Sequence, residues 1–273
     1  MITSTQNPRI VEARKLTQRK YRQRQNRFLV DGLQLLTLAL QNKRIRTRHL
    51  FYCETLFVGE TARHLLNSYE MAGAELLPVS ESVMASLSER DTPQGLVAMF
   101  APSEIEWTVR EWLALPTVSQ PNHLILVVDK LQDPGNLGTL IRTADAVGAA
   151  GVVLLEPCAD PFDLKTIRGT MGSLFTMPFV RVKEPLEILP KLTNLGYRLV
   201  GADGTQGQIV WQSQAMAGSV ALILGNEARG LSEELHPFLS HYVSLPLRGQ
   251  AESLNVAVAG GALMYEWLRV NEK

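Results

Sequence analysis

The stretch Leu245-Pro-Leu-Arg-Gly-Gln-Ala-Glu-Ser-Leu-Asn-Val-Ala257 joins an apolar strand to a long apolar helix and decides the fold of the C-terminal part. We expect the strand over Tyr242 to Leu245 and the helix over Leu254 to Val270. Ser253 and Asn255 stand at the entrance of this helix, where backbone N–H groups have no partner within the helix. Exposed polar side chains beside such N–H groups predict a small-ligand site.

Apolar runs that alternate with helical stretches continue upstream of this segment. The expected strands are Leu124 to Val128, Gly151 to Leu155, Pro178 to Val182, Leu199 to Ala202, Val220 to Leu224 and Tyr242 to Leu245. Continuously apolar strands separated by helices are typical of a parallel sheet covered on both faces. The sequence therefore predicts an α/β C-terminal domain.

Polar residues follow three of the expected strands. Asn136 and Arg142 lie in and after one loop, Glu227 follows Gly225 in a second, and Ser253 and Asn255 lie in the third. Each has an ordinary structural explanation, as a helix cap or an ion-pair partner. Because ligands of parallel sheets bind beyond the carboxyl ends of strands, their coincidence at three strand ends predicts a reaction centre.

The first hundred residues predict a smaller α/β or α+β domain. Its expected helices are Pro8 to Arg24, Asp31 to Leu40 and Ala62 to Ala72, and its expected strands are Phe28 to Val30, Leu50 to Tyr52, Leu56 to Val58, Glu75 to Val79 and Gly95 to Phe100. Prolines after residue 101 indicate a linker with a short helical piece. We therefore divide the chain into a domain at 1–105, a linker at 106–121 and a domain at 122–273.

The net charge of zero conceals an asymmetry. Residues 1–50 contain twelve Lys and Arg but only two acids, Glu12 and Asp31. A solvated basic helix explains one charge run, but a run of seven cations without an acid favours a nucleic acid partner. A membrane surface is a weaker alternative because the run lacks an apolar face. The expected RNA-binding residues are Arg14, Lys15, Arg19, Lys20, Arg22, Arg24 and Arg27.

Other classes of protein are disfavoured. No apolar run is long enough to span a bilayer, and charges from Arg9 onward interrupt any signal peptide. Cys53 and Cys158 lie far apart and fit a reducing cytoplasm. The five histidines have no metal-binding spacing, so we expect no metal. P-loop, Rossmann, GxSxG and HExxH motifs are also absent from the sequence.

Three motifs carry a family resemblance. Asn136-x5-Arg142-Thr-Ala-Asp-x2-Gly148, Leu224-Gly-Asn-Glu-x2-Gly230-Leu-Ser and Leu245-Pro-x2-Gly249-x3-Ser253-Leu-Asn-Val resemble, in order and spacing, the motifs of SpoU (TrmH-type) RNA 2′-O-ribose methyltransferases of the SPOUT superfamily. The N-terminal part resembles the family's substrate-binding domain, a fold related to small RNA-binding ribosomal proteins. It does so through Ser4-x2-Asn7-Pro, Tyr21-Arg22-x4-Arg27-Phe-Leu-Val-Asp-Gly32 and Thr92-Pro-Gln-Gly95.

The resemblance implies an enzyme that moves a methyl group from S-adenosylmethionine to a ribose 2′-hydroxyl of structured RNA, with ribosomal RNA as the expected substrate. It implies a deep trefoil knot in the C-terminal sheet and a homodimer whose sites draw on both subunits. Cofactor contacts fall on Leu224, Gly225, Leu245 and Leu254. The catalytic set comprises Arg142, Asn136, Glu227, Ser253 and Asn255.

Three alternatives remain open. Transfer RNA is a second substrate class. A non-catalytic RNA-binding protein could retain the fold, although the complete polar set argues against it. A base methyltransferase on the same fold would differ in the modified atom, which mass spectrometry of the product distinguishes.

Overall fold

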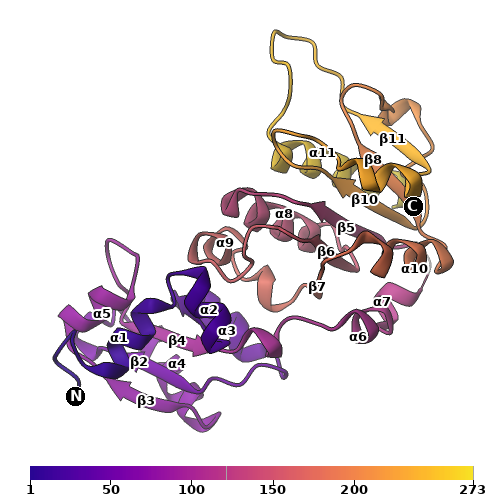
Figure 1. Ribbon diagram of the computed structural model, residues 1–273. Coiled ribbons are helices and arrows are strands. Elements are labelled where there is room, and N and C mark those ends of the chain that lie inside the picture. Colours follow the sequence, from indigo (N-terminus) through magenta and orange to yellow (C-terminus); the bar gives the residue numbers. More distant parts are fainter. Residues whose placement is uncertain (121, 273) are drawn as a thin grey trace. The chain divides into compact units, whose positions relative to one another are not determined.

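The structure is a computed structural model that describes residues 1–120 and 122–272 (Figure 1). Its contacts divide the chain into two compact units. Unit 1 comprises Met1–Ile105 and Asp160–Thr176, and unit 2 comprises the described residues of Glu106–Ala159 and Met177–Lys273. A short segment from the middle of the chain therefore packs with the N-terminal unit.

Unit 1 is built on a four-stranded mixed sheet in the order β1-β4-β2-β3. β1 (Phe28–Asp31) and β2 (His49–Tyr52) both pair antiparallel with β4 (Leu96–Phe100), while β3 (Glu75–Pro78) runs parallel to β2. Its helices are α1 (Pro8–Lys15), α2 (Arg19–Gln25), α3 (Leu33–Gln41), α4 (Thr61–Met71), α5 (Glu81–Leu87) and α9 (Leu164–Gly169), with 3₁₀ turns η1 (Glu54–Leu56), η2 (Pro102–Glu104) and η3 (Ser173–Phe175).

Two expected elements of unit 1 differ in the structure. The single helix expected over Pro8 to Arg24 is two helices, because the chain turns after Leu16, whose side chain is buried in the core. The strand expected over Leu56 to Val58 is replaced by η1. There the Cys53 N–H donates to the Gly95 carbonyl, and the Leu56 N–H closes a turn onto the Cys53 carbonyl. Apolar composition alone did not reveal that turn.

Unit 2 contains a seven-stranded sheet in the order β7-β6-β5-β10-β8-β11-β9. Every strand pair in it is parallel, which confirms the expected sheet. Its strands are β5 (Leu124–Asp129), β6 (Gly151–Leu155), β7 (Phe179–Val182), β8 (Arg198–Ala202), β9 (Gln208–Ile209), β10 (Val220–Leu224) and β11 (His241–Ser244). The two-residue β9 is too short to produce a periodic sequence signal.

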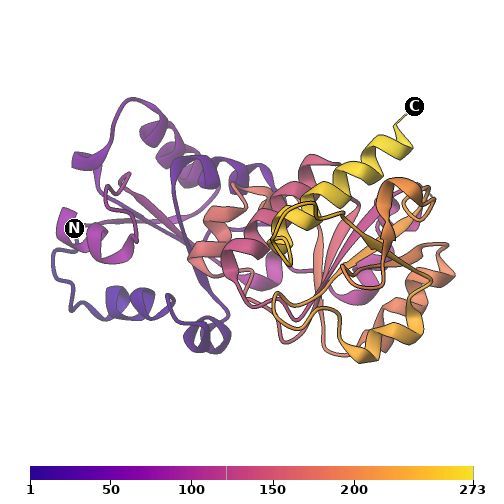
Figure 2. The ribbon, with the colours of Figure 1, turned by 90° about the horizontal axis from the view of Figure 1, so that it is seen from above.

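Helices cover both faces of this sheet. α8 (Pro134–Ala146) and α11 (Val256–Asn271) pack together against β6 and β10, and α11 is the yellow helix of Figure 2. A Cβ at Gly260 of α11 would lie 2.5 Å from a Leu224 methyl and 2.6 Å from a Leu140 methyl, so the helices touch closely there. The expectation of two covered faces is confirmed.

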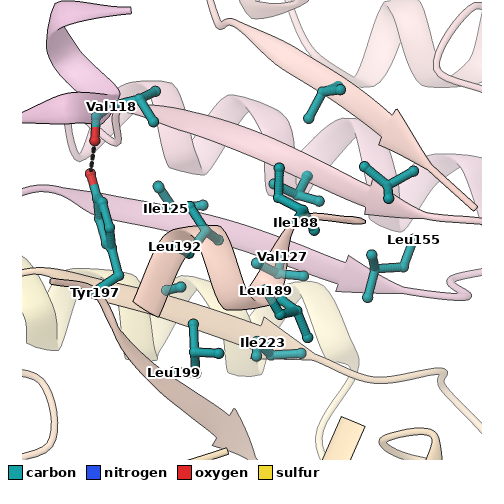
Figure 3. Packing of buried hydrophobic residues seen from close by; sticks show 14 of the residues in the cluster. Val118, Ile125, Val127, Leu155, Ile188, Leu189, Leu192, Tyr197, Leu199 and Ile223 are labelled. Atoms are coloured by element: carbon teal, nitrogen blue, oxygen red, sulfur yellow. Dashed lines mark hydrogen bonds between the residues drawn. The ribbon is translucent and has the colours of Figure 1, made fainter. Parts of the chain in front are cut away.

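The opposite face of the sheet carries a large apolar cluster (Figure 3). Ile125, Val127 and Ile223 contribute from the strands, and the Tyr197 hydroxyl donates to the Val118 carbonyl at 2.8 Å. The covering elements are α6 (Val109–Leu113), α7 (Pro116–Ser119), α10 (Leu189–Asn194), η4 (Pro185–Glu187) and η6 (Glu233–Phe238); η5 (Val210–Gln212) follows β9.

The parallel arrangement determines where polar loops gather. All seven strands end at one edge of the sheet, so the loops that follow β5, β8, β10 and β11 leave from the same edge. The expected functional residues of unit 2 lie in or after these loops. No helix in the described part of the chain is long and apolar enough to cross a membrane.

Candidate active site

The loop between β5 and α8 prepares Asn136. Lys130 adopts a left-handed backbone with φ of 53°, which turns the chain sharply at the end of β5. Asp133 caps α8, because its Oδ1 accepts the Asn136 N–H at 2.8 Å. Asn136 is therefore in the first helical turn and not itself the cap, and its side-chain amide is available for other partners.

The loop after β10 prepares Glu227. Asn226 donates from Nδ2 to the Lys130 carbonyl at 2.8 Å, and its Oδ1 accepts the Ala228 N–H at 3.0 Å. Gly225 permits the tight return of this loop, since a Cβ there would lie 2.2 Å from the Gly230 carbonyl carbon. The Asn226 turn therefore holds the β10 loop against the β5 loop.

The Glu227 carboxylate joins these two loops. Its Oε2 accepts the Gln132 N–H at 3.2 Å, and its Oε1 accepts the Asp133 N–H at 3.1 Å and the Asn136 Nδ2 at 3.2 Å. Partial burial raises the pKa of Glu227, but these hydrogen bonds and that of its own backbone outweigh burial and lower the pKa. At neutral pH the carboxylate is thus an anion that accepts hydrogen bonds from three neighbours.

Asn255 extends the same hydrogen-bonded chain. Its Nδ2 donates to Asn136 Oδ1 at 3.0 Å, while its Oδ1 caps α11 by accepting the Ala257 N–H at 2.9 Å. The structure therefore links Glu227, Asn136 and Asn255, which come from three loops. We call this set the Asn–Glu–Asn chain, after the sequence order Asn136, Glu227 and Asn255; Asn136 binds both of the others.

A cavity of about 170 Å³ lies over the ends of β8 and β11. Two of the four expected cofactor residues, Leu245 and Leu254, line it, and Ser253 lines it with them. Leu224 is buried against Gly260, and Gly225 supports the neighbouring loop. The full lining is Ala202, Asp203, Gly204, Val243, Ser244, Leu245, Leu247, Glu252, Ser253, Leu254, Ala259 and Leu263.

Asp203 is a lining residue that the sequence reasoning missed. Its carboxylate accepts the Thr205 N–H at 2.7 Å, the Thr205 hydroxyl at 2.6 Å and the Gln206 Nε2 at 2.9 Å. Partial burial raises the pKa of Asp203, but these hydrogen bonds prevail and lower the pKa to about 2. Its position directly after an expected strand was the signal that could have revealed it.

Arg142 is exposed on α8 and does not join the Asn–Glu–Asn chain. It follows Asn136 by six helical positions, which amounts to about 240° around the helix axis and about 9 Å along it. Within one copy of the protein, these two side chains therefore diverge. Ser253 is also exposed, and Asn255 caps α11 in its place.

Arg22 differs from the other expected RNA-binding residues because it is buried, with 3% of its surface exposed. Its Nε donates to Asp160 at 2.8 Å, and Nη2 donates to Asp163 at 3.2 Å. Nη1 donates to the Leu16 and Thr17 carbonyls at the break between α1 and α2. The guanidinium is fully engaged within unit 1, so we omit it from the RNA-binding proposal below.

The remaining six basic residues lie on or beside α1 and α2 and are exposed or half-buried. Lys15 pairs with Glu12 at 2.6 Å, Arg14 donates to the Thr5 carbonyl at 3.0 Å, and Arg27 contacts the Met99 sulfur at 3.8 Å. Lys20 and Arg24 are exposed.

In the described residues, no group of His, Cys, Asp and Glu side chains has the geometry to hold a metal ion.

Two protein families have sequence models that match this chain. The sequence model of the SpoU rRNA methylase family matches residues 123–265, and that of the MRM3-like substrate binding domain matches residues 7–98. The chain is 35% identical over 265 residues to the Bacillus subtilis 23S rRNA (guanosine(2553)-2′-O)-methyltransferase RlmP, covering 97% of each chain.

Solved structures agree with these sequence matches. An AdoMet-bound rRNA methyltransferase from Sinorhizobium meliloti superposes with a TM-score of 0.85 at 31% identity, covering 98% of this chain and 97% of the other. The SpoU methyltransferase AviRb from Streptomyces viridochromogenes, in complex with AdoMet, superposes with a TM-score of 0.85 at 29% identity, covering 97% and 98%. The likeness extends over both units.

Proposed function

Because the chain belongs to the SpoU rRNA methylase family, we propose that it transfers a methyl group from S-adenosylmethionine to a ribose 2′-hydroxyl of ribosomal RNA. The observation that carries this proposal is the Asn–Glu–Asn chain, which joins the three expected motifs at the carboxyl edge of the sheet. The Bacillus subtilis and Sinorhizobium meliloti proteins, which match this chain over nearly their whole length, are rRNA methyltransferases.

The cavity at Leu245 and Leu254 suits S-adenosylmethionine. Its apolar walls match the adenine and methylene groups, and the carboxylates of Asp203 and Glu252 complement the positive sulfonium and ammonium groups. Pockets that hold ligands of this size measure roughly 300–1,000 Å³. Since the cavity measures about 170 Å³, we propose that the loop carrying the exposed Leu247 and Leu254 moves outward on binding.

In this proposal the cofactor supplies an activated methyl group, and the protein aligns a weak nucleophile with it. Glu227 holds Asn136, Asn136 holds Asn255, and Asn255 fixes the start of α11 beside Ser253. Glu227 is unsuited to accept the 2′-hydroxyl proton, because its pKa is lowered and its carboxylate already accepts three hydrogen bonds. Its proposed role is positioning.

We propose that Arg142 orients the ribose or its phosphate in the site of a second copy. Its divergence from Asn136 supports this proposal, since one copy alone does not bring the two together. Val258 and Tyr265 of α11 are 59% and 53% exposed, and α11 packs on the helix that carries Arg142. A homodimer formed through this face would cover these apolar side chains.

We further propose a knotted C-terminal sheet, an RNA-binding surface on unit 1 and a cytoplasmic location. β10 is hydrogen-bonded between β5 and β8, two strands that precede it in the chain, and this order supports a trefoil knot around the cofactor site. Unit 1 would bind RNA through Arg14, Lys15, Arg19, Lys20, Arg24 and Arg27, in agreement with the matching substrate-binding domain. A ribosomal RNA substrate is consistent with the proposed cytoplasmic location.

Methyl incorporation tests the function and its substrate class together. The purified protein is incubated with tritiated S-adenosylmethionine and either unmodified 23S rRNA transcript or a pool of unmodified tRNA transcripts. We expect acid-precipitable label in the ribosomal RNA. Label in tRNA alone would replace the substrate class, and RNA binding without any incorporation would favour the non-catalytic alternative.

A further inference from the structure

A second and larger groove lies on unit 2, with a volume of about 860 Å³. Its walls come from the loops after β5, β6 and β10, whereas the cofactor cavity lies over β8 and β11. Because every strand runs parallel, both hollows open at the carboxyl edge of the sheet. Its lining is Lys130, Gln132, Pro157, Asn226, Ala228, Arg229, Gly230, Leu231, Ser232 and Glu233. We call it the β5–β10 groove.

Glu227 stands at the border of the β5–β10 groove. The next residue, Ala228, lines the groove. The Glu227 carboxylate accepts the N–H of Gln132, which lines the opposite wall. The same carboxylate begins the Asn–Glu–Asn chain that leads to Asn255 and the cofactor cavity. A ligand in the β5–β10 groove would therefore lie next to the positioning residues of the proposed reaction.

The candidate contact for an anionic ligand in the groove is Arg229, because the other charges there are the paired Lys130 and the carboxylates of Glu233 and, at the border, Glu227. Lys130 and Arg229 line the groove against one acid, Glu233. Lys130 is paired with Glu234 at 2.6 Å, which leaves Arg229 as the accessible cation of the lining. In the described part of the chain, no side chain or carbonyl binds the exposed Arg229 guanidinium.

The backbone beneath Arg229 is held in place. The Arg229 N–H donates to Asn226 Oδ1 at 3.2 Å, and Asn226 and Gly230 exchange two backbone hydrogen bonds of 2.9 Å. Across the groove, Gln132 Nε2 donates to the Lys130 and Pro157 carbonyls. Such pre-ordering reduces the entropy lost on binding, and an arginine fork matches the oxygens of a phosphate.

We propose that the β5–β10 groove binds an RNA backbone phosphate adjacent to the methylated ribose, with Arg229 as its main contact. The proposal rests on the proposed function, which supplies RNA as the ligand, and adds a residue that positions the acceptor strand. The groove volume also accommodates a nucleotide.

Arg229→Ala tests the proposal, and Arg110→Ala is its matched control. Arg110 is also an exposed arginine of unit 2, but it lies on α6, whose Trp112 packs on Gly151 at the amino end of β6. We expect Arg229→Ala to weaken binding to 23S rRNA transcript about tenfold and to reduce the slope of log affinity against log salt by about one. Arg229→Lys should recover part of the affinity.

Calorimetry with S-adenosylmethionine provides the second readout, and Arg229→Ala should bind the cofactor as the wild type does. Replacing the phosphate beside the methylated ribose by one neutral methylphosphonate should lower the affinity of the wild-type protein for the RNA. The same replacement should not lower the affinity of Arg229→Ala any further. Equal affinities and salt slopes for Arg229→Ala and Arg110→Ala would overturn the proposal. A wild-type protein that binds the RNA but transfers no methyl group would instead contradict the proposed function.

Discussion

At the scale of single residues, two sets of side chains join segments that lie far apart in the sequence: the Asn–Glu–Asn chain, and the ion pairs of Arg22 with Asp160 and Asp163. Asn136, Glu227 and Asn255 each follow an apolar strand, so their convergence could be predicted from the parallel sheet. Arg22 lies in a basic run that indicates RNA binding, but its partner Asp160 is 138 residues away. No local pattern reveals such a pair.

Arg22→Ala should strongly destabilise the protein. Removing one partner from a buried ion pair leaves Asp160 and Asp163 without their cation and costs about 3–5 kcal/mol. Urea unfolding measures this change, with Arg24→Ala as control because Arg24 is an exposed residue of the same helix. We expect the control to remain within about 0.5 kcal/mol of wild type. Equal stabilities of the two variants would contradict a structural role for Arg22.

Arg142→Ala should abolish turnover and leave cofactor binding largely intact. Arg142 is exposed and lies outside the residues that line the cofactor cavity. Single-turnover methyl transfer and calorimetry with S-adenosylmethionine measure the two properties separately. Loss of cofactor affinity in a folded Arg142→Ala protein would refute this division of roles.

At the scale of elements, the strands of unit 2 were predictable because buried parallel strands are continuously apolar. The expected run from Val220 to Leu224 agrees with β10 as observed. Helix breaks were harder, since the turn after Leu16 lacks glycine and proline and is stabilised by the Arg22 guanidinium, which donates to the Leu16 and Thr17 carbonyls. α5 was missed although Ser80 caps it by accepting the Val83 N–H.

The adjacent glycines of α11 provide a test of helix packing. A Cβ at Gly260 would overlap methyl groups of Leu224 and Leu140, whereas a Cβ at Gly261 would lie 3.8 Å from Thr143 Cγ2, an ordinary contact. We expect Gly261→Ala to stabilise the protein by about 0.5–1 kcal/mol through higher helix propensity. Gly260→Ala should be less stable than Gly261→Ala by about 1–3 kcal/mol because it overpacks the core.

Thermal and urea unfolding of both variants measure that order. The two changes are chemically identical and adjacent, so propensity cancels in the comparison. If Gly260→Ala proved as stable as Gly261→Ala, the close approach of α11 to β10 and α8 would be refuted.

At the scale of the whole molecule, the sequence predicted two regions of different character, but it did not reveal which segments of the chain make up each compact unit. Contacts place Asp160–Thr176 with unit 1, although it follows two strands of the unit 2 sheet in the chain. Part of the reason is Arg22, which binds Asp160 and Asp163. Because buried contacts assign this segment to unit 1, no change in amino-acid composition marks where it begins and ends in the sequence.

The charge asymmetry predicts RNA affinity that decreases steeply with salt. Residues 1–50 carry twelve basic and two acidic residues, and phosphate contacts release condensed counterions on binding. A titration with 23S rRNA transcript between 50 and 200 mM salt should show at least a tenfold loss if three or more phosphates are contacted. An affinity that hardly changes would show that the basic helices do not contact the RNA backbone.

The identity of the methylated nucleoside tests the central claim most directly. Unmodified 23S rRNA transcript is incubated with the protein and S-adenosylmethionine, digested to nucleosides and separated by mass spectrometry. We predict one nucleoside whose added methyl group remains on the sugar fragment. A methyl group on the base fragment, or no methylated nucleoside from RNA that the protein binds, would contradict ribose 2′-O-methylation.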